Sequence, residues 1–258
     1  MHITDLAHQW RDPERWRDRG GWWQCQLLAG WPHGFGGCRS YPRLPEVLAV
    51  QWWQEQGRSG QSATWVHQVH GDCVLRVENR DPESRADALV TTTPGQSVWV
   101  STADCVPILM ASRAGVVAIH AGWRGTAAQI AVKALAALDT DLGVTPEEVT
   151  VAIGPCISGP VYQVSQEVAD QVLATLPTDH SATVVLPDPL PDKVRLDLGL
   201  TNALQLLNAG IPSAKITIHP LCTWHNAEVL FSYRRLGSLK VGDAPPWVQW
   251  SGIALPES

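Results

Sequence analysis

The sequence contains few methionines, no long apolar run and no excess of positive charge. Only 2 of its 258 residues are methionine, and nowhere does it approach the ~18 consecutive apolar residues that a membrane-spanning helix needs. Lysine and arginine number 19 against 25 acidic residues, so the net charge is −6 and there is no basic surface of the kind that binds nucleic acid. The sequence therefore predicts a globular protein whose partners are neither membranes nor nucleic acids.

Cysteine pairs of the C-x-x-C type are also absent. The six cysteines are scattered, and the segment Met1–Leu6 lacks the charged and then apolar pattern of a secretory signal. In a chain without an export signal, scattered cysteines are expected to be free thiols or metal ligands rather than disulfides. Structural zinc sites usually contain close cysteine pairs, so their absence argues against a site of that kind.

What the sequence does contain is the material for one sizeable domain over residues 1–258. Apolar side chains make up 45% of it, some with helical spacing and some in short β-branched runs. These elements alternate irregularly, which predicts a mixed α/β class with a substantial sheet. The predicted helices cover 46–56, 127–138, 168–176 and 200–207, and the predicted strands cover 24–29, 64–66, 73–77, 89–90, 98–110, 149–153 and 215–218.

Three regions are predicted to lie outside this framework. Residues 1–23, rich in arginine, aspartate and tryptophan, are expected to form a surface helix or an irregular arm. Residues 181–191 are expected to form a proline-rich loop around a strand, and the tail from Asp243 onward a loop.

The most informative stretch runs from Gly115 to Gly125. A β-branched apolar run ends on His120, two glycines then bracket Trp-Arg, and a helical pattern follows. A strand that enters such a turn and then a helix offers a ligand an imidazole, a guanidinium and free backbone N–H groups. We expect Arg124 and the N–H groups after Gly122 to bind an anion. The alternative is that Arg124 pairs with a surface carboxylate.

His70 and Cys105 lie on two further segments, upstream of His120. One thiolate and two neutral imidazoles suit Zn²⁺, and three protein ligands leave a fourth position open, as in catalytic zinc sites. These three residues are therefore candidates for a metal centre with a catalytic role. On spacing alone, the alternative is that both histidines form hydrogen bonds within the fold and that the cysteine is a buried apolar residue.

The same residues allow two other interpretations. Cys105 is a candidate nucleophile, with His120 as its base and Asp104 orienting a histidine. A blue-copper site also uses two histidines, a cysteine and a distant methionine. Met110, however, lies at an odd offset from Cys105, which in a regular strand points it to the other face. Zinc is therefore favoured over copper.

Several segments together resemble a known family. They occur in the order found in the YfiH family, formerly described as multicopper polyphenol oxidoreductases (laccase-like) and now as zinc-dependent purine nucleoside phosphorylases. Any one segment alone would be a weak signal, but their joint occurrence over about residues 61–235 is specific. The matching segments are 67–71, 86–90, 102–107, 120–125, 153–157, 162–164, 196–198 and 231–235.

The resemblance implies an α/β/β/α layered sandwich, cytoplasmic and monomeric, with a catalytic zinc on His70, Cys105 and His120. It implies phosphorolysis of adenosine, inosine, guanosine and 5′-methylthioadenosine, with a purine nucleoside and phosphate as partners and adenosine deaminase activity alongside. Zinc deaminases of another family use a glutamate as proton shuttle. No glutamate follows either histidine here, so Asp104 is the candidate.

The sequence therefore predicts a zinc-dependent purine nucleoside phosphorylase. One alternative is a copper-dependent polyphenol oxidase. The other is a metal-stabilised binding protein for a nucleotide or a cell-wall precursor. Segments 36–40 and 236–240 depart from the family pattern, so the metal site is the more secure part of the resemblance.

Overall fold

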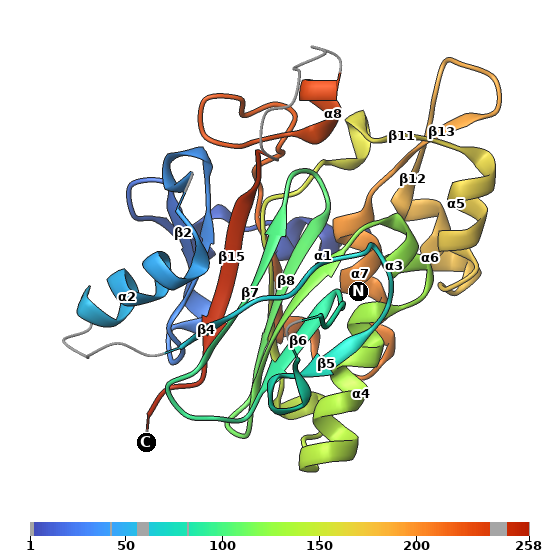
Figure 1. Ribbon diagram of the computed structural model, residues 1–258. Coiled ribbons are helices and arrows are strands. Elements are labelled where there is room, and N and C mark those ends of the chain that lie inside the picture. Colours follow the sequence, from blue (N-terminus) through green and yellow to red (C-terminus); the bar gives the residue numbers. More distant parts are fainter. Residues whose placement is uncertain (1–2, 42, 56–61, 82, 238–246, 258) are drawn as a thin grey trace.

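The computed structural model describes residues 3–41, 43–55, 62–81, 83–237 and 247–257. Its strands form two six-stranded sheets, which pack face to face, and one small three-stranded sheet (Figure 1). The first sheet has the order β1 (Trp16–Asp18), β2 (Trp22–Cys25), β3 (His33–Gly36), β15 (Gln249–Ala254), β7 (Ser97–Thr102) and β4 (Ala63–Thr64).

The second sheet has the order β14 (Ile216–Ile218), β10 (Thr150–Ile153), β8 (Val106–Ala111), β9 (Val116–Ala121), β6 (Ala88–Thr91) and β5 (Val74–Arg76). The small sheet has the order β11 (Gln163–Ser165), β13 (Lys193–Leu196) and β12 (Val185–Pro187).

Helices cover the outer faces of the two large sheets. On the second sheet lie α1 (Ile3–Trp10), α3 (Trp123–Ala127), α4 (Ile130–Leu142) and α7 (Leu198–Asn208). On the first sheet lies α2 (Pro45–Glu55), and beside the small sheet lie α5 (Gln166–Leu173) and α6 (Thr178–Val184). A short helix, α8 (Tyr233–Gly237), precedes β15 (Figure 1). No helix among the described residues has the length and apolarity needed to cross a membrane.

Three apolar cores fill the three interfaces between these layers. The largest lies between the second sheet and its helices and contains Ile108 and Ile119 from the sheet and Leu135 from α4. The next lies between the two sheets, where Leu109 and Ala118 meet the first sheet. The smallest lies between α2 and the first sheet. Successive residues of a strand point to opposite faces, so the central strands of the second sheet are buried on both sides. This is the α/β/β/α sandwich that the resemblance implied.

The local signals of the second sheet and its helices are confirmed. The apolar positions from Ile130 to Leu138 form the buried face of α4. Ser165 caps α5, its hydroxyl accepting a hydrogen bond from the backbone N–H of Val168. The helix expected from residue 127 is divided at Gln129, whose left-handed φ of 56° separates α3 from α4.

Four expectations about the chain's organisation were wrong in whole or in part. Within residues 1–23, α1 is a helix on the outside of the second sheet, as one of the two alternatives expected, but Trp10 is fully buried and β1 and β2 belong to the first sheet. The tail contains β15, an interior strand of that sheet, although residues 243–246 lie outside the described part.

The loop expected over 181–191 does contain a strand, β12, but its first residues belong to helix α6. The strand expected over 98–110 is two strands in different sheets. Pairing between segments distant in sequence determines the positions of β15 and β7.

Candidate metal centre

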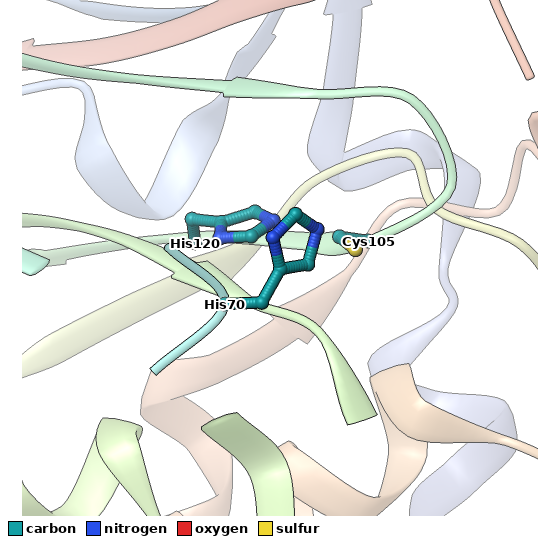
Figure 2. Close-up of side chains that lie close together, drawn as sticks. All are labelled: His70, Cys105 and His120. Atoms are coloured by element: carbon teal, nitrogen blue, oxygen red, sulfur yellow. The ribbon is translucent and has the colours of Figure 1, made fainter. Parts of the chain in front are cut away.

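Three side chains from separate segments meet at one end of the second sheet. The ligand atoms of His70, Cys105 and His120 all lie within 4.8 Å of one another (Figure 2). The two imidazole rings stand edge to face, with centroids 4.7 Å apart and planes at 89°. Within the described ranges, this is the one group of three or more histidine, cysteine or acidic side chains that is placed to hold a metal ion.

The hairpin of β8 and β9 brings Cys105 and His120 together. In its register Val106 pairs with Ala121 and Pro107 with His120. Cys105 comes directly before β8 and therefore lies beside the end of β9, although 14 positions of sequence separate the two ligands. The third ligand, His70, comes from the loop between β4 and β5.

Asp87 positions both histidine ligands from a fully buried site beside the start of β6. One carboxylate oxygen lies 2.8 Å from Nδ1 of His120 and accepts a hydrogen bond from the backbone N–H of His70 at 2.9 Å. The other oxygen accepts from the N–H of Gly71 at 2.7 Å. When Nδ1 of His120 donates to Asp87, Nε2 keeps its lone pair for a metal, the arrangement seen behind many metal-binding histidines.

The loop that carries His70 is also tied to the first sheet. The side-chain amide of Gln68 donates to the carbonyl of Ser101 at 2.8 Å and accepts from the N–H of Ser101 at 2.7 Å. Ser101 belongs to β7. The ligand loop is thus held between Asp87 on one sheet and Ser101 on the other.

Two residues of this end have a backbone conformation that non-glycine residues rarely adopt. The φ angle is 58° at His70 and 98° at Asp104. Such conformations cost about 1–3 kcal/mol each and persist where surrounding contacts enforce them, often at functional sites. The contacts of Asp87 enforce the first. The carboxylate of Asp104 enforces the second, because it accepts hydrogen bonds from the Thr223 hydroxyl at 2.6 Å and the Arg234 N–H at 2.7 Å.

Glycine is required where the turn after β9 passes behind the ligands. A Cβ atom on Gly122 would lie 3.2 Å from the sulfur of Cys105 and 3.3 Å from Cδ2 of His70. A Cβ atom on Gly125 would lie 2.9 Å from the carbonyl oxygen of Gly71. The glycines of the motif therefore let the turn pack against the ligands.

The protonation of the centre favours metal binding by the cysteine. Burial by itself would raise the pKa of the Cys105 thiol, but interactions with His120 and His70 lower it to about 7. Burial likewise disfavours a charged His120, yet contacts with Asp87 and Cys105 raise its pKa to about 9. The thiolate is the form that binds metal. A thiolate and two imidazoles, one oriented by a carboxylate, fit a zinc ion and leave one coordination position to a fourth ligand.

Arg124 and Asp104 differ in their surroundings. The Arg124 side chain is exposed, with its guanidinium 4.3 Å from the centroid of the Trp123 ring. Within the described part of the chain it forms no ion pair with a carboxylate, the contact considered as the alternative. Asp104 is buried, and both of its carboxylate oxygens already accept hydrogen bonds.

Sequence reasoning assigned no role to Asp87 or Tyr162. Tyr162 is half-buried, and the guanidinium of Arg234 lies 5.1 Å from the centroid of its ring. Burial raises the pKa of Tyr162 to about 12, with Cys105 and Asp104 adding to the effect. For Asp87 a signal existed, because a lone carboxylate just before a buried apolar strand needs partners. For Tyr162 the matching family segment was the only signal.

The methionine that a blue-copper site needs is placed elsewhere. Met110 is fully buried in the core between the second sheet and its helices, and it pairs in register with Val117. Four residues of β8 separate Met110 from the end that carries Cys105. The second methionine, Met1, lies outside the described residues.

Fold and site together define a four-layer α/β protein with a centre of two histidines and one cysteine at the end of an inner sheet. The chain belongs to the family described as multi-copper polyphenol oxidoreductase laccase, which matches residues 50–244. A solved structure of a YfiH protein confirms the fold that the resemblance implied. The Bacillus licheniformis hypothetical protein YfiH superposes with a TM-score of 0.79 over 93% of this chain and 98% of its own, at 24% identity.

Two relatives have names that indicate an activity. A purine nucleoside phosphorylase of Synechocystis is 41% identical over 254 residues, covering 89% of this chain and 91% of the relative. An adenosine deaminase from an unknown prokaryotic organism is 39% identical over 155 residues, covering 58% of this chain and 57% of the relative. Both names refer to purine chemistry.

Proposed function

We propose that this protein is a zinc-dependent purine nucleoside phosphorylase that also deaminates adenosine. The observation that carries the proposal is the group of His70, Cys105 and His120, with Asp87 joining two of them. The extensive similarity to a phosphorylase and the shorter similarity to a deaminase support the same assignment. The proposed substrates are adenosine, inosine, guanosine and 5′-methylthioadenosine together with phosphate, used by a cytoplasmic monomer.

His70, Cys105 and His120 would hold the metal, and the open side of the centre lies at His70, which is exposed. When bound there, zinc supplies Lewis acidity at its open position. Asp87 keeps His120 in one orientation and, by holding the loop, fixes the position of His70. Gly122 lets the turn approach the ligands closely.

Phosphate would bind next to this centre, where Arg124 extends from the turn after β9. The guanidinium has no carboxylate partner among the described residues, so its charge is available to an anion. A charge-assisted hydrogen bond of this kind is worth about 1.5–3 kcal/mol. Phosphorolysis needs a phosphate oxygen aimed at C1′ of the ribose, and Arg124 would hold the anion in that orientation.

Deamination at C6 of adenosine also needs a proton shuttle, and the proposed residue is Asp104. Its carboxylate accepts hydrogen bonds from Thr223 and from the backbone of Arg234. Each oxygen keeps a second lone pair that can take up a proton, but Asp104 is buried and its carboxylate is held by these two bonds. We therefore expect deamination to be slower than phosphorolysis.

The test is product analysis from inosine across a phosphate titration. The proposal expects ribose 1-phosphate, formed at a rate that rises with phosphate, and a weaker phosphate dependence in Arg124→Ala with the metal retained. A loss of 1.5–3 kcal/mol corresponds to roughly 10–150-fold in affinity for phosphate. Lys193→Ala, which removes an exposed charge from β13, is the matched control. Free ribose as the only sugar product would refute phosphorolysis, and an unchanged phosphate dependence in Arg124→Ala would remove Arg124 from the anion site.

The family's description also names polyphenol oxidation, which makes a copper enzyme the second candidate. The donor set of two imidazoles and a thiolate accepts either metal. The buried position of Met110 speaks against a blue-copper arrangement. Metal analysis of the purified protein distinguishes the two, and nucleoside turnover distinguishes an enzyme from a metal-stabilised binding protein.

A further inference from the structure

A cavity lies away from the metal centre, beside β1, β2 and the start of β3. Its volume is about 590 Å³, within the range of about 300–1,000 Å³ that small-molecule sites occupy. It reaches Pro256, just beyond the end of β15. The metal ligands lie toward the start of β15, because Thr102, the residue of β7 nearest to them, pairs with Gln249. The lining residues that matter to its chemistry are Arg17, Arg19, Gln24, Gln26, Trp31 and His33.

The two arginines point to the same side of the first sheet. Arg17 and Arg19 are two positions apart, and in the strand register Arg17 pairs with Gln24. Trp16, the residue before Arg17 at the start of β1, belongs instead to the core between the two sheets. Helix α2 covers the β15–β7–β4 side of the outer face, so this face of β1 and β2 remains open to solvent.

The charges of these arginines are not neutralised inside the molecule. Among the described residues no acidic side chain pairs with Arg17 or Arg19. The other two arginines of the same segment are different, because Arg11 pairs with Asp197 at 2.6 Å and Arg15 donates to the carbonyl of Ile216. In a chain with a net charge of −6, two neighbouring uncompensated guanidinium groups form a local anion-binding surface.

The wall and the floor of the cavity are rigid and uncharged. The indole N–H of Trp31 donates to the carbonyl of Ser112 at 3.2 Å, which fixes a half-buried ring at the cavity. His33 is buried, and its two ring nitrogens contact the carbonyl of Trp31 at 2.8 Å and the N–H of Cys25 at 2.7 Å. Burial lowers the pKa of His33 to about 4, so the floor carries no charge at neutral pH.

An anionic group and a flat ring are the two features that this cavity can bind together. Guanidinium groups bind phosphate through charge-assisted hydrogen bonds, and an indole offers a face or an edge to an aromatic ring. The amides of Gln24 and Gln26 add donors and acceptors for a sugar or a base. We propose that this cavity is a binding site for a nucleotide, with its phosphate at Arg17 and Arg19 and its base at Trp31.

The two sites lie at opposite ends of the sandwich. Ser112, the partner of Trp31, comes directly after β8, whereas Cys105 comes directly before it. A six-residue strand is about 20 Å long. A nucleotide in this cavity would therefore not touch a substrate at the metal centre, and the proposal does not depend on the activity of that centre.

The test is calorimetric titration of the full-length, zinc-loaded protein with AMP, adenosine and inorganic phosphate. The proposal expects AMP to bind more tightly than phosphate, and Arg17→Gln with Arg19→Gln to weaken AMP binding at least tenfold. Arg80→Gln with Lys193→Gln removes the same charge from exposed positions elsewhere and should leave AMP binding unchanged. Trp31→Leu should weaken AMP binding while leaving phosphate binding unaltered.

A second arm separates this cavity from the metal centre. The Cys105→Ser variant should keep the affinity of the wild type for AMP, since Cys105 does not line the cavity. AMP binding that is absent in wild type, that is lost in Cys105→Ser, or that is unchanged in the double arginine variant would overturn the proposal. In the Arg124→Ala variant, which lacks the phosphate site proposed at the metal centre, phosphate binding as tight as that of AMP would overturn the nucleotide assignment.

Discussion

The two large sheets contribute differently to this protein. The second sheet contains the hairpin of β8 and β9, and its central strands are buried on both faces. These two strands carry Cys105 and His120 at their ends. The first sheet joins strands from both ends of the chain, since β15 pairs between β3 and β7. It provides no metal ligand and contacts the centre through Ser101 and Gln68.

We therefore expect the first sheet to contribute mainly to stability and the metal end of the second sheet mainly to metal binding. Changes at the metal end of the second sheet should alter metal binding far more than folding. Changes inside the first sheet should alter folding and leave the geometry of the centre intact in the molecules that remain folded. The predictions below test both halves of this comparison.

The largest effect is expected from Ile253→Ala in β15. Ile253 is fully buried between the two sheets, and loss of such a side chain typically costs about 2–5 kcal/mol. Denaturant unfolding measures this loss, and metal content per folded chain should stay the same. Leu190→Ala, at a side chain that is 54% exposed, is the control and should change stability by about 0.5 kcal/mol or less. A stability change at Ile253 as small as that at Leu190 would contradict the role of β15 in the core.

Sequence patterns predicted the second sheet better than the first, for a physical reason. Apolar runs such as 116–119 and the apolar face of α4 are local patterns, and the structure buries these same residues. In contrast, β1 is only three residues long, too short to show a period, and β15 is a strand through pairing with the distant strands β3 and β7. The three candidate ligands were predicted from the chemistry of their side chains. The role of Asp87 required the structure, because it depends on contacts with strand β9 and with the loop that carries His70.

An intermediate effect is expected from Asp87→Asn. The amide retains the shape of the carboxylate but loses its charge, so it orients His120 less firmly. Replacing such a partner behind a metal ligand typically weakens metal affinity by about 10–100-fold. Competition with a chromophoric chelator measures the affinity. Asp72→Asn, at an exposed partner of Lys133, removes one charge from the loop that carries His70 and serves as control. Equal affinities in both variants would show that Asp87 does not position the ligands.

A smaller effect is expected in acid, where His219 makes the free energy of unfolding depend on pH. His219 packs edge-on against Trp16 and Trp23, and burial lowers its pKa from 6.5 to about 3. The unfolded chain therefore takes up a proton near pH 6.5 that the folded chain refuses, so the stability from the neutral ring is present above pH 6.5 and falls as the pH drops toward 3. The loss is about 1.4 kcal/mol per pH unit for one such group.

A comparison of wild type with His219→Asn isolates the contribution of His219 to the pH dependence of stability. Unfolding free energies measured between pH 6 and pH 4 should fall more steeply for wild type, by about 1.4 kcal/mol per pH unit. Parallel slopes would show that His219 does not remain neutral in the folded protein. Metal binding at the ends of β8 and β9 should respond to this substitution only through the fraction folded.

The central claim is that His70, Cys105 and His120 hold a zinc ion on which phosphorolysis depends. The direct measurement is a zinc titration of metal-free protein with inosine and phosphate, following ribose 1-phosphate and bound metal together. The account expects activity to rise with zinc and to level off at about one ion per chain. A double variant with His70→Ala and Cys105→Ser should neither retain zinc nor form the product. Full zinc occupancy in that variant, or undiminished ribose 1-phosphate from metal-free protein, would contradict the account.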